Sequence, residues 1–110
     1  MQPKKIAIIA RDLAADKKAE DPLVLDVGDL TSFSRYFVLT HGNSDRHVKA
    51  IAWHIIDSLK DKKEKPLHIE GMETGQWVLI DYGAVIVHIF HRDIREFYNL
   101  ERLWGEAPRL

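Results

Sequence analysis

The 110-residue sequence contains no cysteine, which excludes disulfide bonds, thiol catalysis and cysteine-ligated zinc. It also has no apolar run of the length that a membrane-spanning helix requires. The first twenty residues are charged every few positions and have no long apolar core, so they do not resemble a signal peptide. We therefore expect a cytoplasmic protein with no membrane association.

An excess of charge of one sign is absent too. There are 16 basic and 17 acidic residues, and the formal charge at pH 7 is −1. This balance argues against broad, charge-driven binding to nucleic acid or to a membrane surface. We expect little direct nucleic-acid contact, although an average composition does not exclude a local basic patch.

The residues that are present are typical of one globular domain, with 45% hydrophobic and 30% charged content. Apolar residues at helical spacing predict a first helix that ends before Pro22, and a second helix that follows the N-cap residue Ser44. Short β-branched and aromatic runs predict five strands, at 23–27, 35–41, 67–70, 77–81 and 84–90. Residues 92–104 are expected to be helical, and residues 105–110 to form a loose tail.

This order, α-β-β-α-β-β-β-α, predicts a single α/β domain over residues 1–110. Its core would be a mixed sheet of about five strands flanked by helices.

The segment GQWVLIDYGAVIVHIF, residues 75–90, is the least polar part of the chain and predicts a hairpin. A turn at Tyr82-Gly83 would place Asp81 opposite Ala84, and Trp77 opposite His88. Because strand side chains alternate, one face would be uniformly β-branched and suited to packing under helices. That face carries Val78, Ile80, Val85, Val87 and Ile89.

The other hairpin face mixes apolar and polar groups, and it carries Trp77, Leu79, Asp81, Ile86, His88 and Phe90. Two interpretations remain open from the residues alone. The face either packs under a second helical layer with hydrogen-bonded polar groups, or forms the core of a protein interface, where aromatic residues are enriched.

Catalysis is not indicated by these residues. In the predicted register Asp81 and His88 lie too far apart for an acid–base pair, and no serine has a nucleophile-elbow context. No pair among the six histidines has the i, i+4 spacing of a helical zinc motif. We therefore expect no catalytic residue, no metal and no cofactor.

Several segments together resemble the ribosomal silencing factor family, also called the Iojap family. They are VLDVGDLTSFSRYFVLTHGNSDRHVKAIA, then EG, WVLIDYGAVIVHIF, the spaced residues of REFY, and LERLW, in the family's order over about residues 4–104. The resemblance implies a sheet topology related to nucleotidyltransferases, without that family's acidic metal pair.

The resemblance implies a translational repressor rather than an enzyme. Members of the family bind large-subunit ribosomal protein fourteen and block joining of the ribosomal subunits when nutrients are scarce. Alternatives are a large-subunit assembly factor, as in organelles, and a nucleotidyltransferase-like enzyme or nucleotide-binding protein. The apolar sheet face also leaves open a homodimer of the free protein.

The resemblance and the hairpin together assign partner binding to one set of residues: Glu70, Trp77, Leu79, Asp81, Tyr82, His88, Phe90 and Tyr98. Two positions depart from the family's pattern. Arg35 and Ala84 stand where the family usually has aspartate, and each departure removes a carboxylate that is suited to holding a basic partner residue.

Overall fold

The elements follow the predicted order. The computed structural model describes residues 1–98, 102 and 105–110, with the backbone alone at 96–98. The helices and strands are α1 Pro3–Asp16, β1 Glu20–Asp26, β2 Tyr36–Gly42, α2 Asp45–Asp61, β3 His68–Glu70, β4 Trp77–Asp81, β5 Val85–His91 and α3 Arg92–Tyr98. The strands form one mixed sheet in the order β1-β2-β5-β4-β3, in which only β2 and β5 are parallel. The predicted fold class is confirmed.

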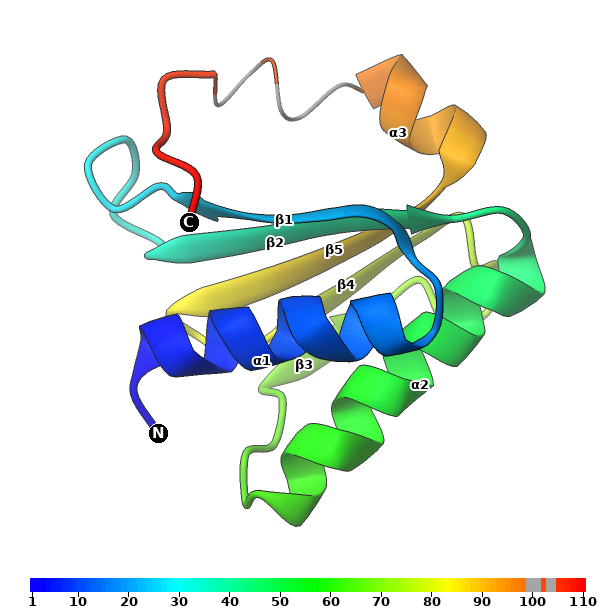
Figure 1. The fold of residues 1–110 in the computed structure, drawn as a ribbon, viewed down its shortest axis with the longest axis horizontal. Coiled ribbons are helices and arrows are strands. Elements are labelled where there is room, and N and C mark those ends of the chain that lie inside the picture. The colour runs from blue at the N-terminus through cyan, green and yellow to red at the C-terminus, as the bar shows by residue number, and fades with distance from the viewer. Residues whose placement is uncertain (99–101, 103–104) are drawn as a thin grey trace.

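Two helices cover one face of the sheet (Figure 1). Helix α1 begins at Pro3, whose fixed φ suits the first helical turn, and it buries the small residues Ala7, Ala10 and Ala14 against the sheet. Helix α2 begins after Ser44, whose side chain accepts a hydrogen bond from the His47 N–H over 3.1 Å. The larger of the two hydrophobic clusters lies between these helices and the sheet.

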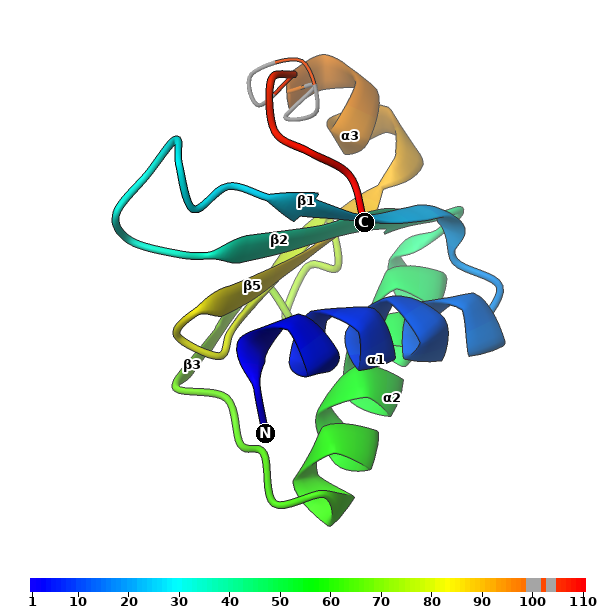
Figure 2. The same ribbon diagram turned by 60° about the vertical axis from the view of Figure 1, so that its left-hand side comes forward.

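The opposite face carries α3 and the C-terminal segment (Figure 2). A second, smaller cluster lies there, formed by Leu25, Val27, Phe37, Leu39, Phe90 and Ala107. The sheet is therefore covered on both faces, and each face has a separate apolar core.

The C-terminal residues are not the loose tail that the sequence predicts. The Pro108 carbonyl accepts a hydrogen bond from the Asp26 N–H over 2.8 Å, and the Leu110 N–H donates to the Val24 carbonyl over 3.0 Å. Arg109 forms a β-bridge with Leu25, and Ala107 is buried. The segment pairs with the outer edge of β1 because an edge strand leaves backbone groups without partners.

The hairpin turn lies one residue further along the chain than predicted. Asp81 pairs with Ile86, Leu79 with His88, and Trp77 with Phe90, so the turn is formed by Gly83 and Ala84. Gly83 has a φ of +85°. A hairpin turn of this kind needs a positive φ at its first position, which glycine adopts readily and tyrosine does not.

Candidate functional site

The predicted alternation along β4 and β5 is confirmed. All five β-branched residues of the first hairpin face are buried in the cluster beneath α1 and α2. Trp77, Ile86 and Phe90 belong to the cluster on the opposite face of the sheet. The two faces therefore have the separate environments that a period of two implies.

An aromatic cluster lies at the centre of that opposite face, formed by Phe37, Trp77, His88 and Phe90. The rings of Trp77 and Phe90 have centroids 4.9 Å apart, and the His88 ring stacks on Phe90 at 6.0 Å. Phe37 meets the edge of His88 at 5.0 Å. Phe37 joins the cluster because β2 pairs in parallel with β5, a long-range pairing that the local sequence pattern does not indicate.

Most of the aromatic cluster is inaccessible. Phe37, His88 and Phe90 are 3%, 6% and 1% exposed, whereas Trp77 is only partly buried. The sequence places His88 and Phe90 on a candidate docking surface, but both side chains are buried. These two residues support Trp77 from beneath, and Trp77 is the member of the cluster that an incoming molecule can touch.

Trp77 and His88 are joined by a hydrogen bond. The Trp77 indole N–H donates to His88 Nδ1 over 3.2 Å, so the proton of the neutral histidine sits on Nε2. Nε2 is buried and has no hydrogen-bond partner among the described residues. Burial lowers the pKa of His88 to about 4, so the ring is neutral at pH 7 and remains a hydrogen-bond acceptor for the indole.

A surface pocket of about 300 Å³ lies beside Trp77. It is lined by Glu70, Gly71, Trp77 and Leu79, three of which the sequence assigns to partner binding. The antiparallel pairing of β3 with β4 sets Glu70 beside Leu79. The Glu70 carboxylate is exposed and lies 2.8 Å from the exposed His68 ring. Apolar and acidic groups therefore line one opening.

The loop between β3 and β4, residues 71–76, holds this pocket in place. Gly71 has a φ of +89°, and a Cβ built on it would lie 1.9 Å from the Trp77 carbonyl oxygen. The loop is tied to α2, because the Lys49 ammonium donates to the Glu73 carbonyl and the Gln76 amide donates to Asp45. Only glycine allows the backbone to approach Trp77 this closely.

Asp81 and Tyr82 lie apart from that pocket. Asp81 Oδ1 accepts a hydrogen bond from the Gly83 N–H over 2.7 Å and stabilises the hairpin turn. Tyr82 packs against the cluster beneath α1 and α2, the opposite side from Trp77. Burial, assisted by the negative charge of Glu64, raises the pKa of Tyr82 to about 12. The structure thus does not bring Tyr82 to the Trp77 face. The Tyr98 side chain lies outside the described residues.

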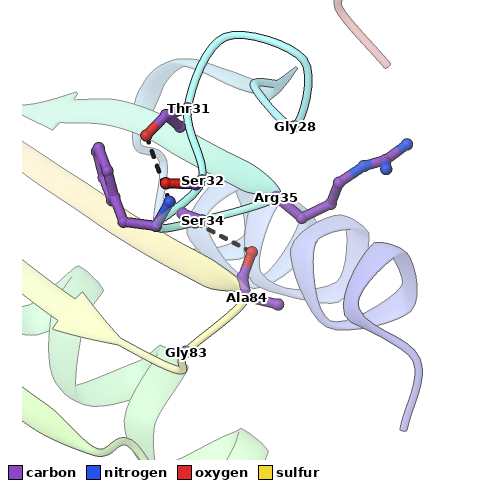
Figure 3. Close-up of a pocket in the computed structure, with 8 residues that line it drawn as sticks. Gly28, Thr31, Ser32, Ser34, Arg35, Gly83 and Ala84 are labelled. Atoms are coloured by element: carbon purple, nitrogen blue, oxygen red, sulfur yellow. Dashed lines mark hydrogen bonds between the residues drawn. The ribbon is translucent and has the colours of Figure 1, made fainter.

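The two departures from the family pattern are neighbours in space. The Arg35 N–H donates to the Ala84 carbonyl over 2.8 Å, and both residues line a second pocket, of about 350 Å³. Figure 3 shows Ser34 directed at the same carbonyl, while the Arg35 side chain points outward. The Arg35 guanidinium lies 3.1 Å from the Asp26 carboxylate, which raises the pKa of Arg35.

Phe33 also lines the second pocket, and it is 63% exposed. Its ring lies 6.1 Å from Phe37 and so borders the aromatic cluster. Phe33 is not among the residues that the sequence assigns to partner binding. An aromatic residue in a polar loop is the local signal that could have identified it.

No group of three or more histidine and carboxylate residues in the described part of the chain is placed to hold a metal ion. None of the helices described is long and apolar enough to cross a membrane.

The fold and site define a class of protein, a small α/β domain with a mixed sheet. A pocket lined by a tryptophan lies on the sheet face opposite α1 and α2. Comparison with known proteins identifies the family. The family model described as ribosomal silencing factor during starvation matches residues 1–110, and this chain belongs to that family.

Individual relatives agree with this assignment. Ribosomal silencing factor RsfS of Bacillus subtilis (strain 168) is 45% identical over 108 residues, which are 98% of this chain and 92% of the relative. A crystal structure of a Chromobacterium violaceum protein superposes with a TM-score of 0.92 at 36% identity, covering 96% of this chain and 88% of that one. The mouse protein named mitochondrial assembly of ribosomal large subunit protein 1 is 30% identical over 95 residues, 84% of this chain and 42% of that protein.

Proposed function

We propose that this protein represses translation by binding the large ribosomal subunit through ribosomal protein fourteen, thereby blocking the small subunit sterically. The family description, a ribosomal silencing factor during starvation, supports the general role. The observation that carries the binding site is the pocket of Glu70, Gly71, Trp77 and Leu79. Such a repressor acts where ribosomes translate, in the cytoplasm, when nutrients are scarce.

Trp77 is the proposed anchor. Its ring is held from beneath by Phe90 and by the hydrogen bond to His88, so little side-chain freedom remains to be lost on binding. Rigid aromatic side chains that are partly exposed beside a pocket are typical binding hot spots. Leu79 adds apolar surface, and the Glu70 carboxylate offers a charge-assisted hydrogen bond to a basic residue of the partner.

Steric exclusion requires no catalysis. The molecule measures 34 × 34 × 22 Å along its principal axes, and direct contacts between subunits need atoms to approach within about 4 Å. A rigid body of this size on the joining surface would keep the subunits apart wherever it is bound. The effect would depend on occupancy alone and would be reversed by dissociation.

Sedimentation of purified subunits with excess protein tests this proposal. We expect the protein to comigrate with large subunits, and the joined-ribosome peak to fall as its concentration rises. An undiminished joined-ribosome peak, with no protein on the large subunit, would overturn the proposal. A titration with Trp77→Ala in parallel links any effect to the pocket.

A role in large-subunit assembly is the second candidate, and the name of the mouse relative favours it. Cells that lack the protein would then accumulate incompletely processed large-subunit RNA during growth. Normal RNA processing in such cells, together with loss of starvation-induced repression, would leave repression as the sole role.

A further inference from the structure

Lysines gather at one end of the helical layer, although the chain as a whole is nearly neutral. The lysine patch consists of Lys4, Lys5, Lys60, Lys62, Lys63 and Lys65. The first two open α1, and the other four close α2 and begin the loop after it. The Met1 amine lies 3.1 Å from the Glu64 carboxylate, which joins the start of α1 to that loop.

All six lysines are exposed, and none forms an ion pair or a side-chain hydrogen bond with another described residue. The two carboxylates within the patch are Asp61 and Glu64, and Glu64 already pairs with the terminal amine. Positive charge is therefore concentrated in this patch, while acidic residues prevail over the rest of the chain.

Helix electrostatics explain only part of the patch. Lys60 and Lys62 lie at the C-terminal end of α2, where the helix dipole favours a cation. Lys4 and Lys5 lie in the first turns of α1, where the same effect disfavours a cation, and no acidic residue offsets them in that turn. A placement that opposes helix stability suggests selection for binding.

A short segment connects the patch to the proposed ribosome-binding pocket. Lys65 precedes Glu70 by five residues, a span of at most about 18 Å even when fully extended. Between them Leu67 is 76% exposed, and its N–H donates to the Asp81 carbonyl over 2.7 Å. A partner as large as a ribosomal subunit can therefore reach both the pocket and the lysines.

We propose that the lysine patch binds the phosphate backbone of RNA on the large subunit. This inference rests on the proposed function and adds a second contact to it. Lysine is a compact, flexible cation suited to phosphates, and it needs no base-specific geometry. Such contacts release counterions, so they weaken steeply as salt concentration rises.

The test compares matched double variants for affinity to purified large subunits at about 50 and 200 mM KCl, a range over which phosphate contacts weaken measurably. Lys62→Gln/Lys63→Gln removes two patch charges, and Lys17→Gln/Lys18→Gln is the control. Each pair is exposed and consists of a helix C-cap residue followed by a residue with positive φ, so the two variants perturb the backbone alike. Lys4→Gln/Lys5→Gln probes the other half of the patch.

Raising the salt should weaken wild type and the Lys17/Lys18 control equally. The salt-induced loss of affinity for large subunits should be about tenfold smaller for either patch variant, because each lacks two phosphate contacts. Lys4→Gln/Lys5→Gln should bind more weakly while resisting denaturant at least as well as wild type. Affinity for isolated ribosomal protein fourteen should be unchanged in all variants.

The outcomes separate the two proposals. If wild-type protein does not bind large subunits, the proposed function is overturned and this inference with it. If wild type binds and the patch variants match the control in affinity and salt dependence, only this inference is overturned. If the patch variants also lose affinity for isolated ribosomal protein fourteen, the patch contacts protein and the RNA assignment is wrong.

Discussion

The indole N–H of Trp77 donates a hydrogen bond to Nδ1 of His88 over 3.2 Å, diagonally across the β4–β5 pair. One partner is partly exposed and the other is buried, so the bond connects the molecular surface to the interior. The histidine has to be neutral for Nδ1 to accept this proton. The orientation of the proposed anchor therefore depends on a group that titrates.

Trp77→Ala should weaken binding to ribosomal protein fourteen by roughly 2–4 kcal/mol, the range of an interface hot spot. The free energy of unfolding should fall by less than the roughly 3–5 kcal/mol lost with a fully buried tryptophan. Trp53→Ala is the matched control, because Trp53 is 50% exposed on α2 and does not line the pocket. Calorimetry and denaturant unfolding measure both quantities, and equal affinities for the two variants would remove Trp77 from the interface.

Stability should fall with acid through His88. Its pKa is about 4 in the folded protein, against an ordinary value of 6.5 when the chain is unfolded, so the unfolded chain binds more protons between these values. The contribution of the neutral His88 ring to the free energy of unfolding is fully present above pH 6.5. It declines as the pH falls to 4, by about 3 kcal/mol in total. His88→Phe should remove this part of the pH dependence, as urea unfolding across that pH range would reveal. Parallel curves for the two proteins would contradict it.

Gly71→Ala should destabilise the protein more than Gly83→Ala. Both glycines have a similar positive φ, which costs an alanine roughly 1–2 kcal/mol. A Cβ at Gly71 would also meet the Trp77 carbonyl oxygen at 1.9 Å, whereas at Gly83 the nearest atom is a Leu67 side-chain carbon at 3.5 Å. Denaturant unfolding of both variants isolates the clash, and equal losses would show that the loop moves freely.

Asp81→Asn should remove the carboxylate charge and preserve the hairpin, because an amide oxygen can still accept a hydrogen bond from the Gly83 N–H. Its free energy of unfolding should change by less than about 1 kcal/mol. Weaker binding of the variant to the ribosomal protein would assign the charge to the interface. Glu70→Gln is the companion variant at the pocket. If Asp81→Asn binds like wild type while Glu70→Gln binds more weakly, the role of Asp81 is restricted to the turn.

Removal of residues 105–110 should lower stability. The truncation leaves the Asp26 N–H and the Val24 carbonyl without their backbone partners, and it removes the buried Ala107 from the smaller core. Two lost hydrogen bonds and an uncovered strand edge predict a cost of about 1–3 kcal/mol. Thermal or denaturant unfolding checks this, and an unchanged midpoint would mean that the segment is loose after all.

Local patterns predicted the elements well, because helix periodicity and strand alternation depend on neighbouring residues. The Ser44 cap and the five buried residues of the first hairpin face are confirmed. The predicted position of the hairpin turn was wrong by one residue. The first residue of the turn needs a positive φ, which selects Gly83 over Tyr82, and the hydrophobic pattern does not report φ.

The site was less predictable than the fold. His88 and Phe90 alternate onto the same face as Trp77, as the sequence indicates, yet they are buried. Tyr82 follows Asp81 and so turns to the helical side. Period-two alternation predicts which residues share a face, but it does not say how deeply each of them is buried.

The sequence by itself determined the order of helices and strands, the family resemblance and the apolar character of both sheet faces, because each is carried by residues close along the chain. Tertiary structure alone decided three further features. It brought Phe37 to His88 through the parallel pairing of β2 with β5, and laid the C-terminal residues along β1. It also joined the two lysine segments into one patch. These features depend on contacts between distant segments, whose closure is selected by the packing of the whole domain.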